Sequence, residues 1–211
     1  MKTSIKILSL LAGLFFVASA LGDDATNYNN SGRAKYNKAD FDGALADCNK
    51  AIELNPKYAE AYVTRGDVKG IKGDSDGAII DYTKAIELKP DDVDAYIGRG
   101  AEKGIKGDWK DALADSNKAI ELKPDDADAY ANRGWVEKKK GDLDAALADF
   151  NKTIELKPDD YYAYFNRGVV KRAKGDTSGA QADFKKTIEL NPKLRDVIEA
   201  KGYLTNGTNS N

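Results

Sequence analysis

The sequence predicts an all-α fold: an α-solenoid, wound as a right-handed superhelix, of five 34-residue helix-turn-helix repeats plus a short C-terminal capping helix. Three observations support this prediction: a fixed proline period, near-identical segments that keep phase without insertion, and apolar residues at helical spacing. A period of this length is typical of helix pairs that bury their apolar faces against neighbouring copies. The prolines that mark it are Pro56, Pro90, Pro124, Pro158 and Pro192.

The same period sets the boundaries of the predicted repeats. They span residues 25–58, 59–92, 93–126, 127–160 and 161–194. A shortened sixth start over 195–204 predicts the capping helix, with its charges toward solvent. The polar stretch 205–211 predicts a disordered tail.

Each predicted repeat consists of two helices joined by a tight turn. In the second helix of the fourth repeat, apolar residues such as Ala146, Phe150 and Ile154 form one stripe, a spacing that excludes a strand. We expect glycine to close each first helix and aspartate to open the next one. These Gly-Asp pairs stand at 73–74, 107–108, 141–142 and 175–176.

A tyrosine stands four residues before a glycine in every predicted first helix. The large ring and the gap at the glycine favour close packing of antiparallel helices by size complementarity. The tyrosines are Tyr28, Tyr62, Tyr96, Tyr130 and Tyr164, and the glycines are Gly32, Gly66, Gly100, Gly134 and Gly168.

With an alanine twelve residues after each of these glycines and the proline near the repeat end, the pattern resembles the tetratricopeptide repeat family. The resemblance implies that the first helices line a concave binding groove. Two departures from the family pattern predict a looser core than in a typical array: Cys48 and Ser116 replace an aromatic of the second helix, and charged residues replace the second aromatic of the first helix. Those charged residues are Lys35, Lys69, Lys103, Glu137 and Lys171.

Residues 1–20 predict a secretory signal peptide. Lys2 and Lys6 precede an apolar run that is too short for a comfortable membrane span, and small residues end it at Ala20. We expect cleavage after Ala20, with Gly22 as the second choice, and export to the periplasm or the medium. An uncleaved anchor is the alternative; after cleavage we expect no membrane insertion.

The sequence predicts no enzyme, no cofactor and no metal site. Histidine is absent, which removes the commonest general base and metal ligand, and phosphate loops and paired-cysteine motifs are missing. Acidic clusters at the helix starts are explained by capping. The single cysteine, Cys48, has the phase of core aromatics and is expected to be buried. The formal net charge of −2 gives no reason to expect nucleic-acid binding.

Partner-binding residues are expected where the repeats differ on the predicted groove face, because packing does not dictate those side chains. In the second and third repeats these residues are small or apolar, and in the fourth and fifth they are aromatic and basic. Trp135 is either an exposed anchor or a ring lying on its neighbouring helix. The candidates are Trp135, Phe165, Tyr162, Lys138, Arg172, Val63 and Ile97.

These residues predict a non-catalytic scaffold that binds a protein or peptide partner, with apolar anchors and some acidic residues, in the concave groove. The alternative is a structural self-assembly or oligomerisation module of the cell envelope. The partial cap over 195–204 favours a monomer. Some members of the family bind the C-terminal carboxylate of a chaperone through a cluster of cationic residues from three consecutive repeats. No three consecutive repeats of this chain contain that set of residues.

Periodic charges predict a ladder between repeats. Each second helix carries an aspartate, and a cation follows 18 residues later in the next first helix, as in Asp115 and Arg133. The first repeat, which has no predecessor, has Ser31 at the arginine phase. We expect each aspartate to pair with the cation of the following repeat.

Overall fold

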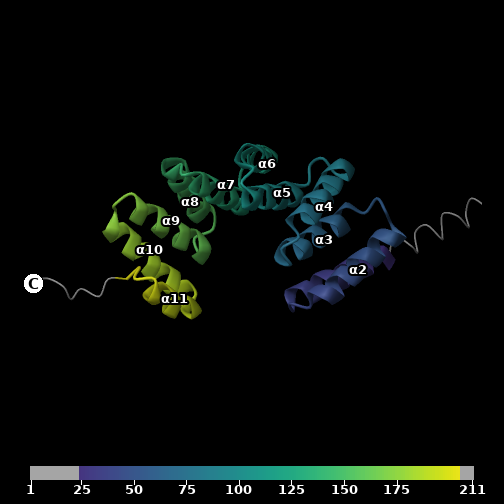
Figure 1. The fold of residues 1–211 in the computed structure, drawn as a ribbon, viewed down its shortest axis with the longest axis horizontal. Helices are drawn as coiled ribbons and strands as arrows, with labels where there is room; N and C mark the ends of the chain where they lie inside the picture. Colours follow the sequence, from purple (N-terminus) through teal and green to yellow (C-terminus); the bar gives the residue numbers. More distant parts are fainter. Residues whose placement is uncertain (1–23, 205–211) are drawn as a thin grey trace, which may run out of the picture. The chain divides into compact units, whose positions relative to one another are not determined.

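The computed structural model describes residues 24–204; the predicted signal peptide over 1–20 and the predicted tail over 205–211 lie outside them. Within the described range the chain is helical and contains no strand, so the predicted all-α fold is confirmed (Figure 1). Residues 24–37 form a helix that precedes those labelled in Figure 1. The others are α2 (Phe41–Leu54), α3 (Ala59–Ile71), α4 (Ser75–Leu88), α5 (Val93–Lys106), α6 (Trp109–Leu122), α7 (Ala127–Lys140), α8 (Leu143–Leu156), α9 (Tyr161–Ala173), α10 (Thr177–Leu190), the 3-10 turn η1 (Pro192–Leu194) and α11 (Arg195–Ala200).

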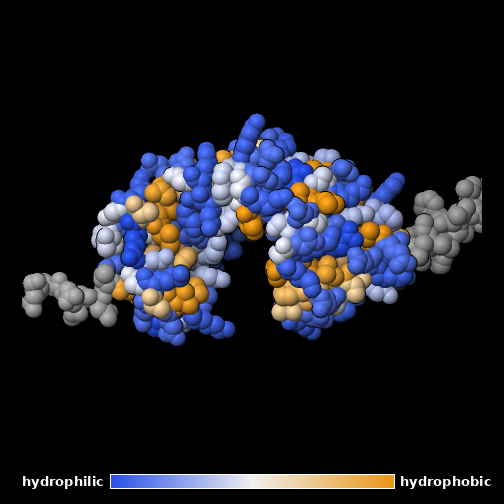
Figure 2. Space-filling view, in the orientation of Figure 1, coloured by the Kyte–Doolittle hydropathy of each residue, from blue (hydrophilic) through white to orange (hydrophobic). Residues whose placement is uncertain are grey.

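The chain divides within α5 into two compact units, which are described separately: unit 1, Met1–Glu102, and unit 2, Lys103–Asn211. In unit 1, α3 packs against α2 and α4; in unit 2, α7 packs against α6 and α8, and α9 against α8 and α10. Charged and polar residues cover most of the visible face of each unit (Figure 2). No helix in the described range is long and apolar enough to cross a membrane.

The turns within the repeats have the predicted chemistry except at Asp108, which precedes α6 but accepts no side-chain capping hydrogen bond from it. The Asp74 carboxylate accepts a hydrogen bond from the Gly77 N–H at 2.9 Å, and Asp40 and Asp176 cap their helices in the same way. The glycine before the cap has a left-handed backbone, with φ of +82° at Gly73. In the first repeat Ala39 stands at this phase with φ of 60°.

Glycines of the first helices face the rings of the second helices, as the size-complementarity argument predicts. An added Cβ would lie 2.9 Å from Tyr82 at Gly66 and 2.9 Å from Phe184 at Gly168. Cys48 is fully buried at the ring phase of the first repeat. In the third repeat the buried Ser116 hydroxyl donates to the Ala112 carbonyl at 3.0 Å.

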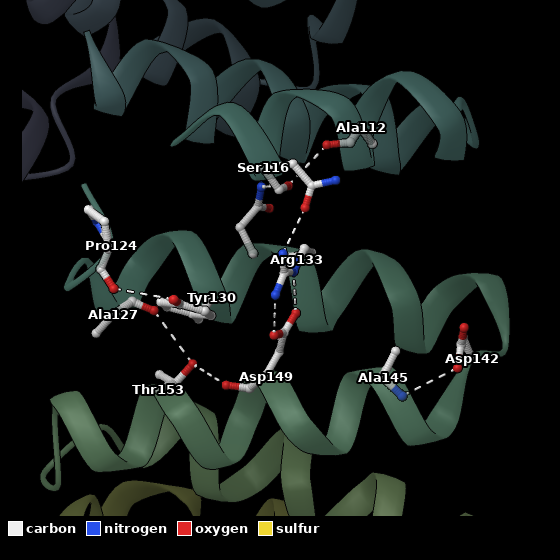
Figure 3. Close-up of polar contacts among 12 residues, drawn as sticks. Ala112, Ser116, Pro124, Ala127, Tyr130, Arg133, Asp142, Ala145, Asp149 and Thr153 are labelled. Carbon is white, nitrogen blue, oxygen red and sulfur yellow. Dashed lines mark hydrogen bonds and ion pairs between the residues drawn. The ribbon is translucent and has the colours of Figure 1, made fainter. Parts of the chain in front are cut away.

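The predicted charge ladder is wrong in its pairing. Arg133 of α7 binds Asp149 of α8, in its own repeat, through Nε at 2.7 Å and Nη2 at 2.8 Å. Figure 3 shows Arg133 directed at Asp149. The remaining nitrogen of Arg133, Nη1, donates to Asn117 of the preceding repeat at 2.7 Å. Equivalent triads are formed by Arg65, Asp81 and Asn49 and by Arg167, Asp183 and Asn151.

The reason for this error is geometric. The second helix of the same repeat is the antiparallel neighbour of the first helix, so its aspartate is the carboxylate within reach. The guanidinium lies over the ring of the tyrosine three residues earlier, at 5.6 Å for Arg133 and Tyr130. The flat fork can then bind the carboxylate with two donors and still direct one donor to the preceding repeat. The link between repeats is therefore an arginine–amide hydrogen bond.

Relief of backbone strain at Ala39 is the first testable prediction. An L-residue in the left-handed region destabilises the folded state by about 1–2 kcal/mol. Glycine removes this strain, but its greater conformational freedom in the unfolded chain offsets part of the gain. Ala39→Gly should therefore raise the free energy of unfolding by about 0.5–1 kcal/mol in urea denaturation. Ala46→Gly, at an exposed position inside α2, is the control and should lower it by about 1 kcal/mol. Equal destabilisation by both changes would contradict the strain.

Candidate functional site

The predicted partner-binding residues fall in both units. Val63 packs half-buried against the core cluster of Tyr62, Ala85 and Ala95 in unit 1, and Ile97 is half-buried on α5. Unit 2 holds the other candidates, on α7 and α9: Trp135, Lys138, Tyr162, Phe165 and Arg172.

Trp135 lies within the packing of unit 2. Its ring fills the space beside Gly104 of α5, where an added Cβ would lie 2.8 Å from Cζ3. It also packs against the core cluster around Phe150, and the Lys139 ammonium lies 5.7 Å from the ring centroid. Of the two predicted roles, the geometry supports the ring lying on its neighbouring helix, although the side chain is only partly buried.

Phe165 and Arg172 are engaged by the C-terminal segment of the described chain. The Phe165 ring lies 6.0 Å from that of Tyr203 and 5.9 Å from that of Phe184. The Arg172 guanidinium lies 4.9 Å from the Tyr203 centroid and donates to the Gly202 carbonyl at 3.1 Å. Among the described residues Trp135 and Phe165 do not stack on each other, because each ring has another packing partner.

Lys138 is also turned inward. Its ammonium donates to the buried Asn166 side-chain oxygen, and the Asn166 amide donates to the Tyr162 carbonyl at 2.9 Å. Burial, with a smaller effect of the Lys139 charge, lowers the pKa of Lys138 to about 8. Lys138 therefore ties α7 to α9 and does not offer a free cation to an acidic partner.

Tyr162 remains open to solvent. It is 47% exposed, its neighbour Tyr161 is 40% exposed, and both border a hollow of about 400 Å³. We call the two rings and this hollow the tyrosine surface. Its lining is completed by Asp128, Ala131, Lys157, Asp159 and Asp160.

Tyr161 is not among the predicted residues, although the aligned copies contain a signal for it. The other repeats have Ala59, Val93 and Ala127 at the Tyr161 phase, and they have Glu60, Asp94 and Asp128 at the Tyr162 phase. Two adjacent positions thus change from small or acidic to aromatic in the fifth repeat alone. Neither ring is demanded by the repeat framework.

Glu137 carries the other unusual charge of unit 2. In four repeats a lysine at this phase binds the buried aspartate, as Lys69 binds Asp81 at 2.7 Å and Lys171 binds Asp183 at 2.9 Å. These ion pairs occupy the place of the family's second aromatic. In the fourth repeat burial and the neighbouring Asp149 carboxylate raise the pKa of Glu137 to about 7.

Neither a reactive cysteine nor a metal-ligand cluster is found among the described residues. Burial raises the pKa of the Cys48 thiol to about 12, so it is not a thiolate nucleophile at neutral pH. Within residues 24–204 no three His, Cys, Asp or Glu side chains are grouped so that they could hold a metal ion. The arrangement can offer rings, carboxylates and backbone groups to a bound chain.

Comparison with known proteins gives a family match over most of the described chain. One tetratricopeptide repeat family model matches residues 25–58, 59–92 and 161–194, and a second tetratricopeptide repeat model matches residues 127–160. No curated protein sequence gives a significant match.

Solved structures with the same fold include proteins of related sequence. MamA is 30% identical, with 83% of this chain and 96% of that chain covered and a TM-score of 0.62. YrrB, described as a TPR protein with an unusual peptide-binding site, is 28% identical, with 85% and 92% covered and a TM-score of 0.60. TTC0263 of Thermus thermophilus is 21% identical, with 85% and 98% covered and a TM-score of 0.76, and shows the fold alone.

Glu137 gives a second prediction, for pH dependence. A carboxyl whose pKa is raised by folding binds its proton more tightly in the folded state, so its contribution to stability falls as pH rises from about 4.5 to 7. Glu137→Lys should remove this loss and bind Asp149. We expect a gain of about 1 kcal/mol at pH 7, discounted for solvent screening, and little gain at pH 4.5 in denaturant titrations. A gain of the same size at both pH values would contradict the assignment.

Proposed function

Because the chain belongs to the tetratricopeptide repeat family, we propose that it is a non-catalytic scaffold that binds a peptide or helix of a partner protein at the tyrosine surface of unit 2. One observation carries this proposal. Tyr161 and Tyr162 are half-exposed beside a hollow of about 400 Å³, at positions where the other repeats need no ring. Tyrosine supplies a large contact area with a polar tip at low entropic cost, which suits an anchor site.

The charges around the hollow revise the expected chemistry of the partner. The sequence suggested acidic residues in the partner because of Lys138 and Arg172, but both donate hydrogen bonds within unit 2. Of the residues that line the hollow, Asp128, Asp159 and Asp160 are acidic and Lys157 alone is basic. A segment with an apolar anchor flanked by basic residues therefore suits this surface better.

The similarity to YrrB supports peptide binding as the mode of action, since that protein is described as having a peptide-binding site. A non-catalytic role follows from the family, whose repeats typically form binding scaffolds. Binding through rings and hydrogen bonds requires neither a nucleophile nor a metal-ligand cluster.

Self-assembly through stacked repeats is the alternative, and the cap weighs against it at one end. Ile198 of α11 is fully buried, and the Tyr203 ring stacks on Phe184 at 4.6 Å. These residues cover the apolar end of the last repeat, which would otherwise be free to accept another copy. We therefore propose a monomer, which sedimentation of the purified protein would test.

Export is part of the same proposal and depends on residues 1–20, which lie outside the described range. A basic start, an apolar core and small residues at Ala20 favour signal cleavage and a partner in the periplasm or the medium. Mass determination of the protein recovered from those fractions would locate the cleavage site.

A third prediction tests the tyrosine surface. Peptides selected from a random library on the wild-type protein should lose at least about 2 kcal/mol of binding, roughly 30-fold in Kd, when Tyr161 and Tyr162 are both changed to alanine. Stability should change by no more than about 0.5 kcal/mol because the rings are half-exposed. Calorimetry and denaturation measure the two quantities.

Two further variants complete this experiment. Tyr28→Ala, at a tyrosine of unit 1 that is also exposed, should leave peptide binding unchanged. Trp135→Ala should lower stability by about 1–3 kcal/mol, as a packing residue would. Retained binding in the double tyrosine variant, or loss of binding with unchanged stability in Trp135→Ala, would place the site elsewhere.

A further inference from the structure

A carboxylate is buried in unit 1 at a position where three of the other repeats place valine and the first places Ala34. Glu102 of α5 has the phase of Val68, Val136 and Val170, all fully buried. Glu102 is itself only 7% exposed. Its Oε2 is buried and has no hydrogen-bond partner within the described residues. A charge placed so at a core position costs stability unless something binds it.

Gly70 of α3 makes room for this carboxylate. An added Cβ at Gly70 would collide with Oε1 and would lie 3.1 Å from Cδ of Glu102. A larger residue at position 70 would therefore push the Glu102 carboxylate away from its present place. The space beside Gly70 is where Glu102 meets α3.

A second carboxylate, that of Asp67, lies on the face of α3 that Glu102 contacts at Gly70. Asp67 stands three residues before Gly70, one turn away on the same side of the helix. Its Oδ1 accepts a hydrogen bond from the Tyr82 hydroxyl at 2.7 Å. The charges of both Asp67 and Glu102 act on Tyr82, with burial the largest effect, and raise its pKa. The Tyr82 hydroxyl is thus close enough to both carboxylates to interact electrostatically with each of them.

The basic residues of α3 do not neutralise this pair. Arg65 and Lys69 both bind Asp81, at 2.6 and 2.7 Å. Burial, opposed by the Tyr82 hydrogen bond, raises the pKa of Asp67 to about 6, with smaller contributions from Asp94 and Asp92 that raise it and from Arg33 that lowers it. Unit 1 therefore holds two carboxylates near Tyr82, and neither has an ion-pair partner among the described residues.

We propose that Glu102 and Asp67, with Gly70 between them on the face of α3, form a binding site in unit 1 for the ammonium group of a lysine side chain from a partner peptide. An ammonium is a compact charge with three donors, which two carboxylates can accept. A divalent metal would require more oxygen ligands than this pair offers. The site is separate from the tyrosine surface of unit 2 and does not depend on it.

The site explains why the third repeat keeps a residue that weakens its core. Glu102→Val would restore the residue that three of the other repeats have, and the ligand-free protein should then melt about 2–4 °C higher. A stabilising change that removes an activity is typical of a binding residue.

Amide shifts in nuclear magnetic resonance test the proposal on the full chain. The probe is a capped alanine peptide with one central lysine, and its control has norleucine in place of that lysine. The lysine peptide should shift the amides of Gly70 and Gly98. Gly98 is included because a Cβ added there would lie 2.8 Å from the Tyr82 hydroxyl oxygen. The Kd for the lysine peptide, obtained by following these shifts in a titration, should rise at least about 10-fold in Glu102→Val and Glu102→Gln. Glu87→Gln, at an exposed acid of α4, should leave this Kd unchanged.

Several outcomes would overturn the proposal. They are equal shifts with the norleucine peptide, no shift with the lysine peptide, binding retained in Glu102→Val, or tighter binding of Mg²⁺ or Ca²⁺ at the same amides. A lower melting temperature in Glu102→Val would show that the glutamate supports the core. Changing Tyr161 and Tyr162 to alanine should leave the lysine-peptide shifts intact, which separates this site from the function proposed for unit 2.

Discussion

A buried aspartate in the second helix of each repeat is the constraint on which the arrangement of the helices depends. Asp81, Asp149 and Asp183 are almost completely buried, and each is bound by an arginine of the preceding first helix. A buried carboxylate left unpaired would cost several kcal/mol, so the arginine must lie where it does. The same arginine reaches the preceding repeat through an asparagine, at Asn49, Asn117 and Asn151. One side chain thereby fixes both the pair of helices within a repeat and the step to the repeat before it.

The functional candidates are the positions that break this regular pattern. Glu137 replaces a lysine beside a buried aspartate, and Glu102 replaces a buried valine. Tyr161 and Tyr162 replace small or acidic residues at a helix start. In a repeat protein each such departure lacks the support that identical neighbours give one another, and natural sequences tend to keep such departures where function requires them. Glu102 and the two tyrosines form the proposed binding sites, whereas Glu137 has only an electrostatic consequence in the structure.

The fold could be predicted from the sequence because the repeat period, the Gly-Asp turns and the glycine–ring pairs are local signals. The site could be predicted only in part. Tyr162 was found by comparing copies, but Phe165 and Arg172 are covered by Tyr203, and the contact of this C-terminal residue with the last full repeat is not visible in an alignment of the copies. The pairing of Arg133 was wrong because two aspartates lie at similar sequence separations, 16 and 18 residues, and only helix geometry distinguishes them. Glu102 could have been found from its phase, since a charge among valines is visible in the aligned copies.

The most direct test of the arginine constraint is a pair of double-mutant cycles at Arg133. Arg133→Gln is combined with Asp149→Asn in one cycle and with Asn117→Ala in the other, and the free energy of unfolding is measured for each variant. The geometry predicts a coupling of about 2–3 kcal/mol with Asp149 and about 0.5–1 kcal/mol with Asn117. A coupling near zero with Asn117 would contradict the claim that the arginine joins neighbouring repeats, and one near zero with Asp149 would contradict the whole account.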